Sequence, residues 1–282
     1  MKDLCNITEV RSLLEKHGFR FSKALGQNFI INPSVCPRMV QESGIDGTCG
    51  VLEIGPGIGV LTQQLALRAK KVVAIELDDR LPALLAETLA DFDNVEIVSG
   101  DVLKLDLAKL IEEKFAGMPV YVCANLPYYI TSPVIMALLE SRLPVEAITV
   151  MVQKEAAQRM CAPVGSRDSG AVTVAVNYYA EAERLFDVSA GSFMPAPKVD
   201  SCVMRLTVRE KPSVSVKDEA KFFKMVRAAF GQRRKTASNS ISSGMGIPKE
   251  QVINAIAACG FEPDVRAESL TMDRLALLSD KL

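Results

Sequence analysis

Residues 51–59 read Val-Leu-Glu-Ile-Gly-Pro-Gly-Ile-Gly, and this stretch decides the fold of the chain. Its apolar beginning, Val51–Ile54, predicts a short buried strand, and Val60–Ala69 predicts the helix that follows. Glycines between a strand and a helix let the backbone approach a ligand closely, because they carry no Cβ atom. The spacing G-x-G-x-G followed by Val60 departs from the dinucleotide fingerprint, which has Gly or Ala there. The stretch therefore predicts a ligand loop, with a tight turn without a ligand as the alternative.

The alternation of strand and helix continues along the chain. Further strands are predicted at residues 71–76, 95–98, 120–124 and 147–152, and helices at residues 8–17, 79–90 and 133–140. Such alternation is typical of a parallel sheet covered by helices on both faces. After Gly170 three successive strands are expected at residues 172–178, 184–188 and 201–208, closing one edge of the sheet. The predicted fold class is α/β, with a doubly wound, Rossmann-like sheet.

The last third of the chain has a different character. A polar linker at residues 210–216 precedes four helical segments, predicted at residues 219–230, 235–242, 249–258 and 270–279. We therefore expect an α/β domain at residues 1–208 and a small all-α domain at residues 209–282. Residues 201–282 hold 14 Lys and Arg against 9 Asp and Glu, whereas residues 1–200 hold 19 against 25. A basic C-terminal third suits a polyanionic partner, although ordinary scatter of charge would explain it equally well.

The composition excludes several classes of protein. With 282 residues, 49% of them hydrophobic, and a net charge of −1, the chain is not intrinsically disordered. The seven cysteines include no C-x-x-C pair, which argues against a disulfide scaffold or a zinc ribbon. His17 is the one histidine, so a histidine triad or a multi-histidine metal site is excluded, and no metal is expected. No signal peptide or membrane-spanning stretch is found, and we expect a cytoplasmic protein.

Acidic residues stand at the ends of the two strands after the glycine loop. Glu76 ends the second strand, 21 residues after Gly55, and its carboxylate can accept both hydroxyls of a ribose. Asp101 follows the third strand and can accept a hydrogen bond from the exocyclic amine of an adenine. Each carboxylate alone could instead cap a helix. No lysine follows the glycines, so there is no P-loop for phosphates. An adenosine cofactor without phosphates fits best, and S-adenosylmethionine matches these features, with Gly55 and Gly57 beside it.

The fourth strand ends in Asn125-Leu126-Pro127-Tyr128. Asn-Pro-Pro-Tyr and its variant Asn-Leu-Pro-Tyr mark methyltransferases that act on exocyclic amines, whereas a helix cap followed by proline is the alternative interpretation. With its neighbouring motifs, the chain resembles the ribosomal small-subunit rRNA adenine dimethyltransferases. The resemblance runs from about Phe21 to Leu278 and rests on five motifs in the family order: Lys23–Phe29, Glu53–Gly59, Asn125–Tyr129, Phe193–Ser201 and Gln232–Lys235.

The chemistry of an adenine amine explains the residues of this motif. The N6 lone pair is delocalised into the ring, so the amine is a poor nucleophile. The Asn125 side chain and the Leu126 carbonyl can accept its hydrogens and draw the nitrogen toward tetrahedral geometry. Pro127 fixes φ and has no N–H to compete, and Tyr128 offers a face on which a purine can stack. Correct placement of an already activated methyl group does most of the catalytic work, so no strong general base is needed.

The resemblance implies further site residues. Phe193 closes over the target base in the family, although from sequence alone it could be a hydrophobic plug. Asn28 and Ile30 cover the cofactor, which Asn125 also contacts. For RNA, the basic residues Lys23, Arg227, Arg233, Arg234 and Lys235 are candidates for phosphate contact, although such clusters are often only solvated. The target adenosine must leave its stack to reach the pocket.

The resemblance implies dimethylation of the N6 amine of two adjacent adenosines in small-subunit (16S) rRNA during ribosome biogenesis. A close alternative is the related enzyme that methylates large-subunit (23S) rRNA and confers macrolide resistance. An RNA-binding assembly factor with incidental methylation is a second alternative. An NAD-dependent oxidoreductase is a third, and Val60 and the Asn125 motif speak against it. The expected partner is the assembling small subunit, and the chain is expected to be a monomer without membrane association.

Overall fold

A computed structural model describes residues 2–22, 25–232 and 234–282. By its internal contacts the chain divides into two compact units. The first comprises residues Met1–Ala157 and Glu183–Val208, and the second comprises Gln158–Ala182 and Arg209–Leu282. The two units are described separately below.

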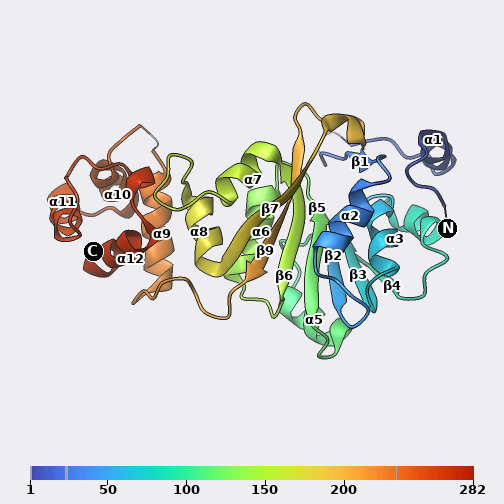
Figure 1. The fold of residues 1–282 in the computed structure, drawn as a ribbon, viewed down its shortest axis with the longest axis horizontal. Coiled ribbons are helices and arrows are strands. Elements are labelled where there is room, and N and C mark those ends of the chain that lie inside the picture. Colours follow the sequence, from blue (N-terminus) through green and yellow to red (C-terminus); the bar gives the residue numbers. More distant parts are fainter. Residues whose placement is uncertain (1, 23–24, 233) are drawn as a thin grey trace. The chain divides into compact units, whose positions relative to one another are not determined.

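The first unit is built on a seven-stranded sheet with the strand order β4-β3-β2-β5-β6-β9-β7 (Figure 1). The neighbouring pairs from β4 to β6 are parallel, and β9 pairs antiparallel with β6. The strands are β2 Gly50–Ile54, β3 Lys71–Glu76, β4 Val95–Ser99, β5 Val120–Asn125, β6 Ala147–Gln153, β7 Ala180–Val188 (in this unit from Glu183) and β9 Ser201–Val208. The predicted α/β class is confirmed.

The strand order reverses at β2. From β2 the chain builds β3 and β4 on one side and then returns to build β5 and β6 on the other. Because parallel crossovers are almost always right-handed, this reversal places the helices of the two halves on opposite faces of the sheet. It also leaves a crevice outside the carboxyl ends of β2 and β5, where open α/β sheets bind their ligands.

The helices of the first unit follow local signals in the sequence. They are α1 Ile7–Lys16, α2 Val35–Glu42, α3 Val60–Ala66, α4 Pro82–Thr88, α5 Leu107–Phe115, α6 Thr131–Glu140 and the start of α7 Lys154–Met160. Asn6 caps α1, because its Oδ1 accepts hydrogen bonds from the amides of Thr8 and Glu9 at 3.0 and 3.4 Å. Asp106 caps α5 in the same way through the Lys109 amide.

A second, two-stranded sheet joins segments far apart in the sequence. The antiparallel strands β1 Phe29–Ile30 and β8 Phe193–Met194 pair with Ile30 opposite Phe193, and a short 3₁₀ turn, Ala190–Ser192, leads into β8. This pairing brings the predicted cofactor-covering residues beside the aromatic residue expected to cover the base.

One predicted strand is wrong: residues 172–178 lie in helix α8 Ala171–Tyr179, in the second unit. The alternation of Val with Thr, Ala and Asn favours a strand, but the helix is buried on almost every side, so periodicity could not decide. Thr173 starts the helix by accepting a hydrogen bond from the Gly170 amide and donating one to the Arg159 carbonyl. Tertiary packing therefore overrides the intrinsic preference of these residues for strands.

The rest of the second unit is helical: α9 Glu219–Phe230, α10 Ala237–Met245, α11 Lys249–Ala258, the 3₁₀ turn Ala267–Ser269 and α12 Met272–Lys281. Tyr178 stacks on Phe222 with ring centroids 5.4 Å apart, and Tyr179 stacks on Phe223 at the same distance. Both tyrosine hydroxyls donate to Glu219, so α8 and α9 share one aromatic core. Within the described ranges, no helix is both long enough and apolar enough to cross a bilayer.

Candidate functional site

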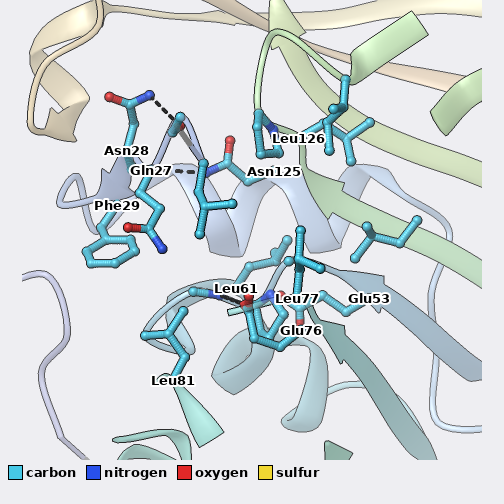
Figure 2. A pocket seen from close by; sticks show the side chains of 18 of the residues that line it. Gln27, Asn28, Phe29, Glu53, Leu61, Glu76, Leu77, Leu81, Asn125 and Leu126 are labelled. Carbon is cyan, nitrogen blue, oxygen red and sulfur yellow. Dashed lines mark hydrogen bonds between the residues drawn. The ribbon is translucent and has the colours of Figure 1, made fainter. Parts of the chain in front are cut away.

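A pocket opens at the carboxyl ends of β2, β3 and β5, at the point where the strand order reverses (Figure 2). Residues 25–30 of the N-terminal segment form part of its wall. All of the predicted catalytic and cofactor-binding residues line it: Asn28, Ile30, Gly55, Gly57, Glu76, Asp101, Asn125, Leu126, Pro127, Tyr128 and Phe193. Six separate segments of the sequence are thus brought to one cavity.

The glycine loop has the backbone that its sequence predicts. Gly55 and Gly57 have φ angles of 70° and 60°, in the left-handed region that side chains rarely adopt. A Cβ on Gly55 would meet nothing within 4 Å, so the loop leaves open space at this position. A Cβ on Gly57 would lie 3.2 Å from the ring of Phe29, because the N-terminal segment passes directly over the loop.

Glu76 is nearly buried at the end of β3. Its carboxylate accepts hydrogen bonds from the Asp78 amide at 2.8 Å and from the Gly57 amide at 3.3 Å. Burial raises the pKa of Glu76 above its ordinary value, and the two amides oppose this change. The side chain is therefore fixed between the glycine loop and the turn after β3, with its oxygens at the cavity wall.

Asp101 lies two residues beyond the end of β4. Its Oδ1 accepts a hydrogen bond from the Leu103 amide at 3.0 Å, and its Oδ2 lies 3.5 Å from Lys104 Nζ. The side chain thus closes a turn but caps no helix, since Asp106 caps α5, and it also lines the pocket.

Asn125 ends β5 on the other side of the cavity from Glu76, facing the segment that carries Asn28 (Figure 2). Its Nδ2 donates to the Asn28 carbonyl at 3.3 Å. The Leu126 amide donates to the Met151 carbonyl at 3.2 Å, which fixes the peptide after Asn125 to strand β6. Because the Asn125 nitrogen is used in this way, its Oδ1 is the atom suited to accept hydrogen from a ligand.

Two aromatic residues complete the wall near Asn125. The Tyr128 hydroxyl shares a hydrogen bond of 2.7 Å with the buried Ser201 hydroxyl, so the ring is anchored at its far end to β9. Phe193 is 4% exposed and is held by the pairing of β8 with β1. The ring positions are thus set by strands on either side of the pocket.

Glu53 is a pocket residue to which the sequence analysis gave no role. It lies on β2 with 1% of its surface exposed, and neither carboxylate oxygen has a hydrogen-bond partner among the described residues. Burial raises the pKa of Glu53 to about 8, the charge of Glu76 adds to this effect, and the Thr62 hydroxyl opposes it. The Thr62 hydroxyl is near enough to act on the charge of Glu53, but its Oγ1 forms no hydrogen bond with the carboxylate. The only signal in the sequence was an acid inside an otherwise apolar strand.

The protonation of Glu53 makes the stability of the cofactor-free protein depend on pH. Unfolding returns the pKa of Glu53 to its ordinary value of about 4.5, so between pH 4.5 and 8 the folded state holds a proton that the unfolded state releases. Stability therefore falls as the pH rises through this window. We expect Glu53→Gln to remove this dependence on pH. Its free energy of unfolding, relative to that of the wild type, should increase by roughly 3 kcal/mol between pH 5 and pH 8. Urea titrations at each pH measure it.

Glu112→Gln is the matched control, because Glu112 is exposed on α5. Its unfolding free energy should run parallel to that of the wild type across the whole range. A constant difference between wild type and Glu53→Gln would contradict the expectation.

Most of the predicted RNA-binding residues lie far from the pocket residues in the sequence, whereas Lys23 shortly precedes the pocket residues 25–30. Lys23 and Arg233 are outside the described residues. Arg227 is exposed in the last turn of α9, and Arg234 and Lys235 are exposed just before α10. Lys224, which was not predicted, lines a shallow groove with Arg227 and Gln232; its spacing of three residues from Arg227 on α9 was the available signal.

Comparison with known proteins decides the family. The model of the ribosomal RNA adenine dimethylase family matches residues 18–279. The chain belongs to the ribosomal RNA adenine dimethylase family. Two "Ribosomal RNA small subunit methyltransferase A" proteins are similar over all of this chain and 97% of their own lengths. The protein from Anoxybacillus flavithermus is 48% identical, and that from Geobacillus thermodenitrificans is 49% identical.

Solved structures of similar proteins carry the same fold. A dimethyladenosine transferase from Plasmodium falciparum is 25% identical, with a TM-score of 0.72 over 89% of this chain and 95% of its own. The 23S rRNA methyltransferase ErmE is 27% identical, with a TM-score of 0.67 over 90% of this chain and 99% of its own. As a ribosomal RNA adenine dimethylase, the chain is an rRNA methyltransferase, which excludes the oxidoreductase alternative.

Proposed function

We propose that this chain transfers methyl groups from S-adenosylmethionine to the N6 amines of two adjacent adenosines in small-subunit (16S) rRNA, during ribosome biogenesis. The observation that carries the proposal is the meeting of all predicted catalytic and cofactor-binding residues at one pocket. The names of the relatives that are 48% and 49% identical support the small subunit as the substrate.

The residues present fit the proposed cofactor. The open space at Gly55 admits a ligand against the loop, and the Glu76 carboxylate is placed to accept the ribose hydroxyls. Asp101 retains Oδ2 for an adenine amine, since Oδ1 is used by the turn. Asn28 and Ile30 form the covering side, and Gly57 lies with Gly55 in the loop. When bound, S-adenosylmethionine supplies an electrophilic methyl group on a sulfonium.

The catalytic side is set by the Asn125–Tyr128 motif. The hydrogen bond from Asn125 Nδ2 to the Asn28 carbonyl presents Oδ1 to the adenine amine, and the Leu126 carbonyl is the second proposed acceptor. Pro127 restricts the backbone between that carbonyl and Tyr128, whose anchored ring offers the stacking surface. Phe193 closes the base from the other side. A monomethylated amine that rotates can present its remaining hydrogen to the same acceptors.

We assign methyl transfer to residues 1–208 and RNA engagement to residues 209–282. Arg227, Arg234 and Lys235 are proposed to contact RNA phosphates, together with Lys23 and Arg233, which lie outside the described residues. The proposed setting is the cytoplasm, without membrane association, where a monomer acts on the assembling small subunit without a metal.

Removal of the basic charges should weaken substrate binding more than it slows chemistry. We expect Arg234→Gln with Lys235→Gln to raise the KM for small subunits about 10-fold and to reduce the salt dependence of binding by about two charges, with kcat nearly unchanged. Methyl-transfer rates at several salt concentrations measure this. Lys249→Gln, on the exposed start of α11, is the control. Equal KM and salt slopes in all three proteins would assign RNA binding elsewhere.

Tritiated methyl transfer to purified, unmethylated ribosomal subunits tests the function. We expect label in the small subunit, recovered as N6,N6-dimethyladenosine after digestion to nucleosides. Label confined to large subunits would favour the macrolide-resistance type of activity, which the likeness to ErmE makes the relevant comparison. Monomethyladenosine as the sole product under exhaustive conditions would contradict dimethylation.

A further inference from the structure

Residues 25–30 line the proposed cofactor pocket, and residues 19–22 precede them in the chain; the two ranges together are here called the cover segment. We propose that Gln27, Asp78 and Arg80 form a latch that fastens this segment over the bound cofactor, which makes Asp78 a positioning residue for cofactor retention. The inference rests on the proposed function and assigns roles to residues outside the catalytic motif.

Asp78 is the centre of the latch. Its side chain is 3% exposed, and it accepts hydrogen bonds from Arg80 Nε at 2.7 Å, Arg80 Nη2 at 2.6 Å and Gln27 Nε2 at 2.8 Å. The hydrogen bonds from Arg80 and Gln27 hold the pKa of Asp78 below its usual value, so this buried carboxylate stays ionised. Hydrogen bonds to a charged group are among the stronger ones in proteins, so breaking one of these contacts is costly.

Arg80 fastens the beginning of the cover segment. Its Nη1 donates to the Arg20 carbonyl at 3.3 Å, and its guanidinium lies 4.8 Å from the centroid of the Phe19 ring. Phe19 in turn contacts Phe21 and Phe29, with centroids 6.2 and 6.0 Å apart. One arginine thus joins Asp78 to both the backbone and the aromatic cluster of the segment.

The far end of the cover segment reaches the pocket itself. Phe29 lies against Gly57 of the glycine loop, and the Asn28 carbonyl accepts the hydrogen bond from Asn125. Gln27 directly precedes Asn28, and its Oε1 accepts a hydrogen bond from the Ser22 amide at 2.9 Å, which joins the two described parts of the segment. Release of Gln27 from Asp78 would therefore free the part of the segment that covers the pocket.

The latch is also tied directly to the proposed ribose site. The Asp78 amide donates to Glu76 Oε1 at 2.8 Å, so the residue that holds the cover segment also orients the Glu76 carboxylate. A cofactor held by Glu76 beneath the segment cannot leave until the segment moves. The latch should consequently set the dissociation rate of the cofactor more than the rate of the chemical step.

A polarity swap tests the proposal. Gln27→Glu keeps the acceptor for the Ser22 amide but replaces the donor to Asp78 by a second carboxylate. We expect S-adenosylmethionine to dissociate about 10-fold faster from this variant, while kcat at saturating cofactor changes less than about threefold. Adding Asp78→Asn, whose amide nitrogen can donate to the new carboxylate while its oxygen still accepts from Arg80 Nε, should recover part of the loss, because the hydrogen bond from Arg80 Nη2 is not restored. Rapid filtration of tritiated S-adenosylmethionine chased with unlabelled cofactor measures the rates.

Two further measurements separate a latch from a general structural role. Asp79→Asn, at the exposed neighbouring carboxylate, should dissociate cofactor at the wild-type rate. Hydrogen exchange should show that Gln27→Glu loses cofactor-dependent protection in the cover segment but keeps it in the loop at residues 53–59. Wild-type dissociation from Gln27→Glu, or failure of Asp78→Asn to rescue it, would overturn the latch. A wild-type protein that binds no S-adenosylmethionine would instead overturn the proposed function.

Discussion

The Asn125→Ala substitution is expected to lower the rate of methyl transfer by on the order of 10³-fold, the size of effect seen when one preorganised hydrogen-bonding group is removed from a reacting centre. Oδ1 of Asn125 is the atom positioned to accept from the adenine amine, because Nδ2 is committed to the Asn28 carbonyl. Without it the amine keeps its planar, weakly nucleophilic form. Cofactor affinity should fall much less, by about 10-fold at most, since one hydrogen bond to the cover is lost.

Single-turnover transfer to small subunits, together with calorimetry of S-adenosylmethionine binding, measures the two effects separately. Asn125→Asp is the informative partner, because it retains an acceptor oxygen but cannot donate to the Asn28 carbonyl; its rate should lie between those of the wild type and Asn125→Ala. Asn254→Ala, at an exposed position on α11, should transfer at the wild-type rate. A nearly normal rate for Asn125→Ala would show that another group prepares the amine.

Glu76→Ala is expected to weaken S-adenosylmethionine binding by about 10²-fold, because the buried carboxylate that we propose accepts two ribose hydroxyls is replaced by a group that accepts none. The loss also frees the Gly57 and Asp78 amides that Glu76 holds in place. Glu76→Gln retains one acceptor oxygen and should lose about 10-fold. Calorimetric titration of each variant measures these affinities.

A ligand variant makes this second test specific. An S-adenosylmethionine analogue without ribose hydroxyls should lose much less affinity on Glu76→Ala than the natural cofactor does, since only the effect of the freed Gly57 and Asp78 amides remains. Glu112→Gln is the control for loss of a carboxylate elsewhere in the first unit. Equal affinity of the wild type and Glu76→Ala for the natural cofactor would mean that Glu76 supports the loop without touching the ribose.

Local sequence patterns predicted some helices and strands correctly and others wrongly. Strands β2, β3 and β5 were predictable because short apolar runs, bounded by glycine or acidic residues, have few alternative structures. Helix α8 was not, because its alternating β-branched residues resemble a strand and its burial comes from the aromatic residues of α9. Helix α10 begins at Ala237 instead of Lys235, because the Thr236 side chain caps it.

The residues of the candidate site likewise include some that the sequence predicted and some that it did not. Gly55, Glu76 and Asn125 were predicted individually because each follows a strand and carries a chemistry that its position can use. The roles of Glu53 and Asp78 were not predictable, since they depend on what surrounds each carboxylate. Glu53 has no hydrogen-bond partner among the described residues, whereas Asp78 accepts four hydrogen bonds from two segments.

The sequence by itself determined the α/β fold class, the glycine loop and the chemical groups offered to an adenosine cofactor and an adenine amine, because these depend on residue types at short spacings. Only the tertiary structure decided that Phe193 pairs with Ile30 and that Gln27 meets Asp78. These contacts join residues far apart along the chain, and their geometry follows from how the sheet and its connections fold in space.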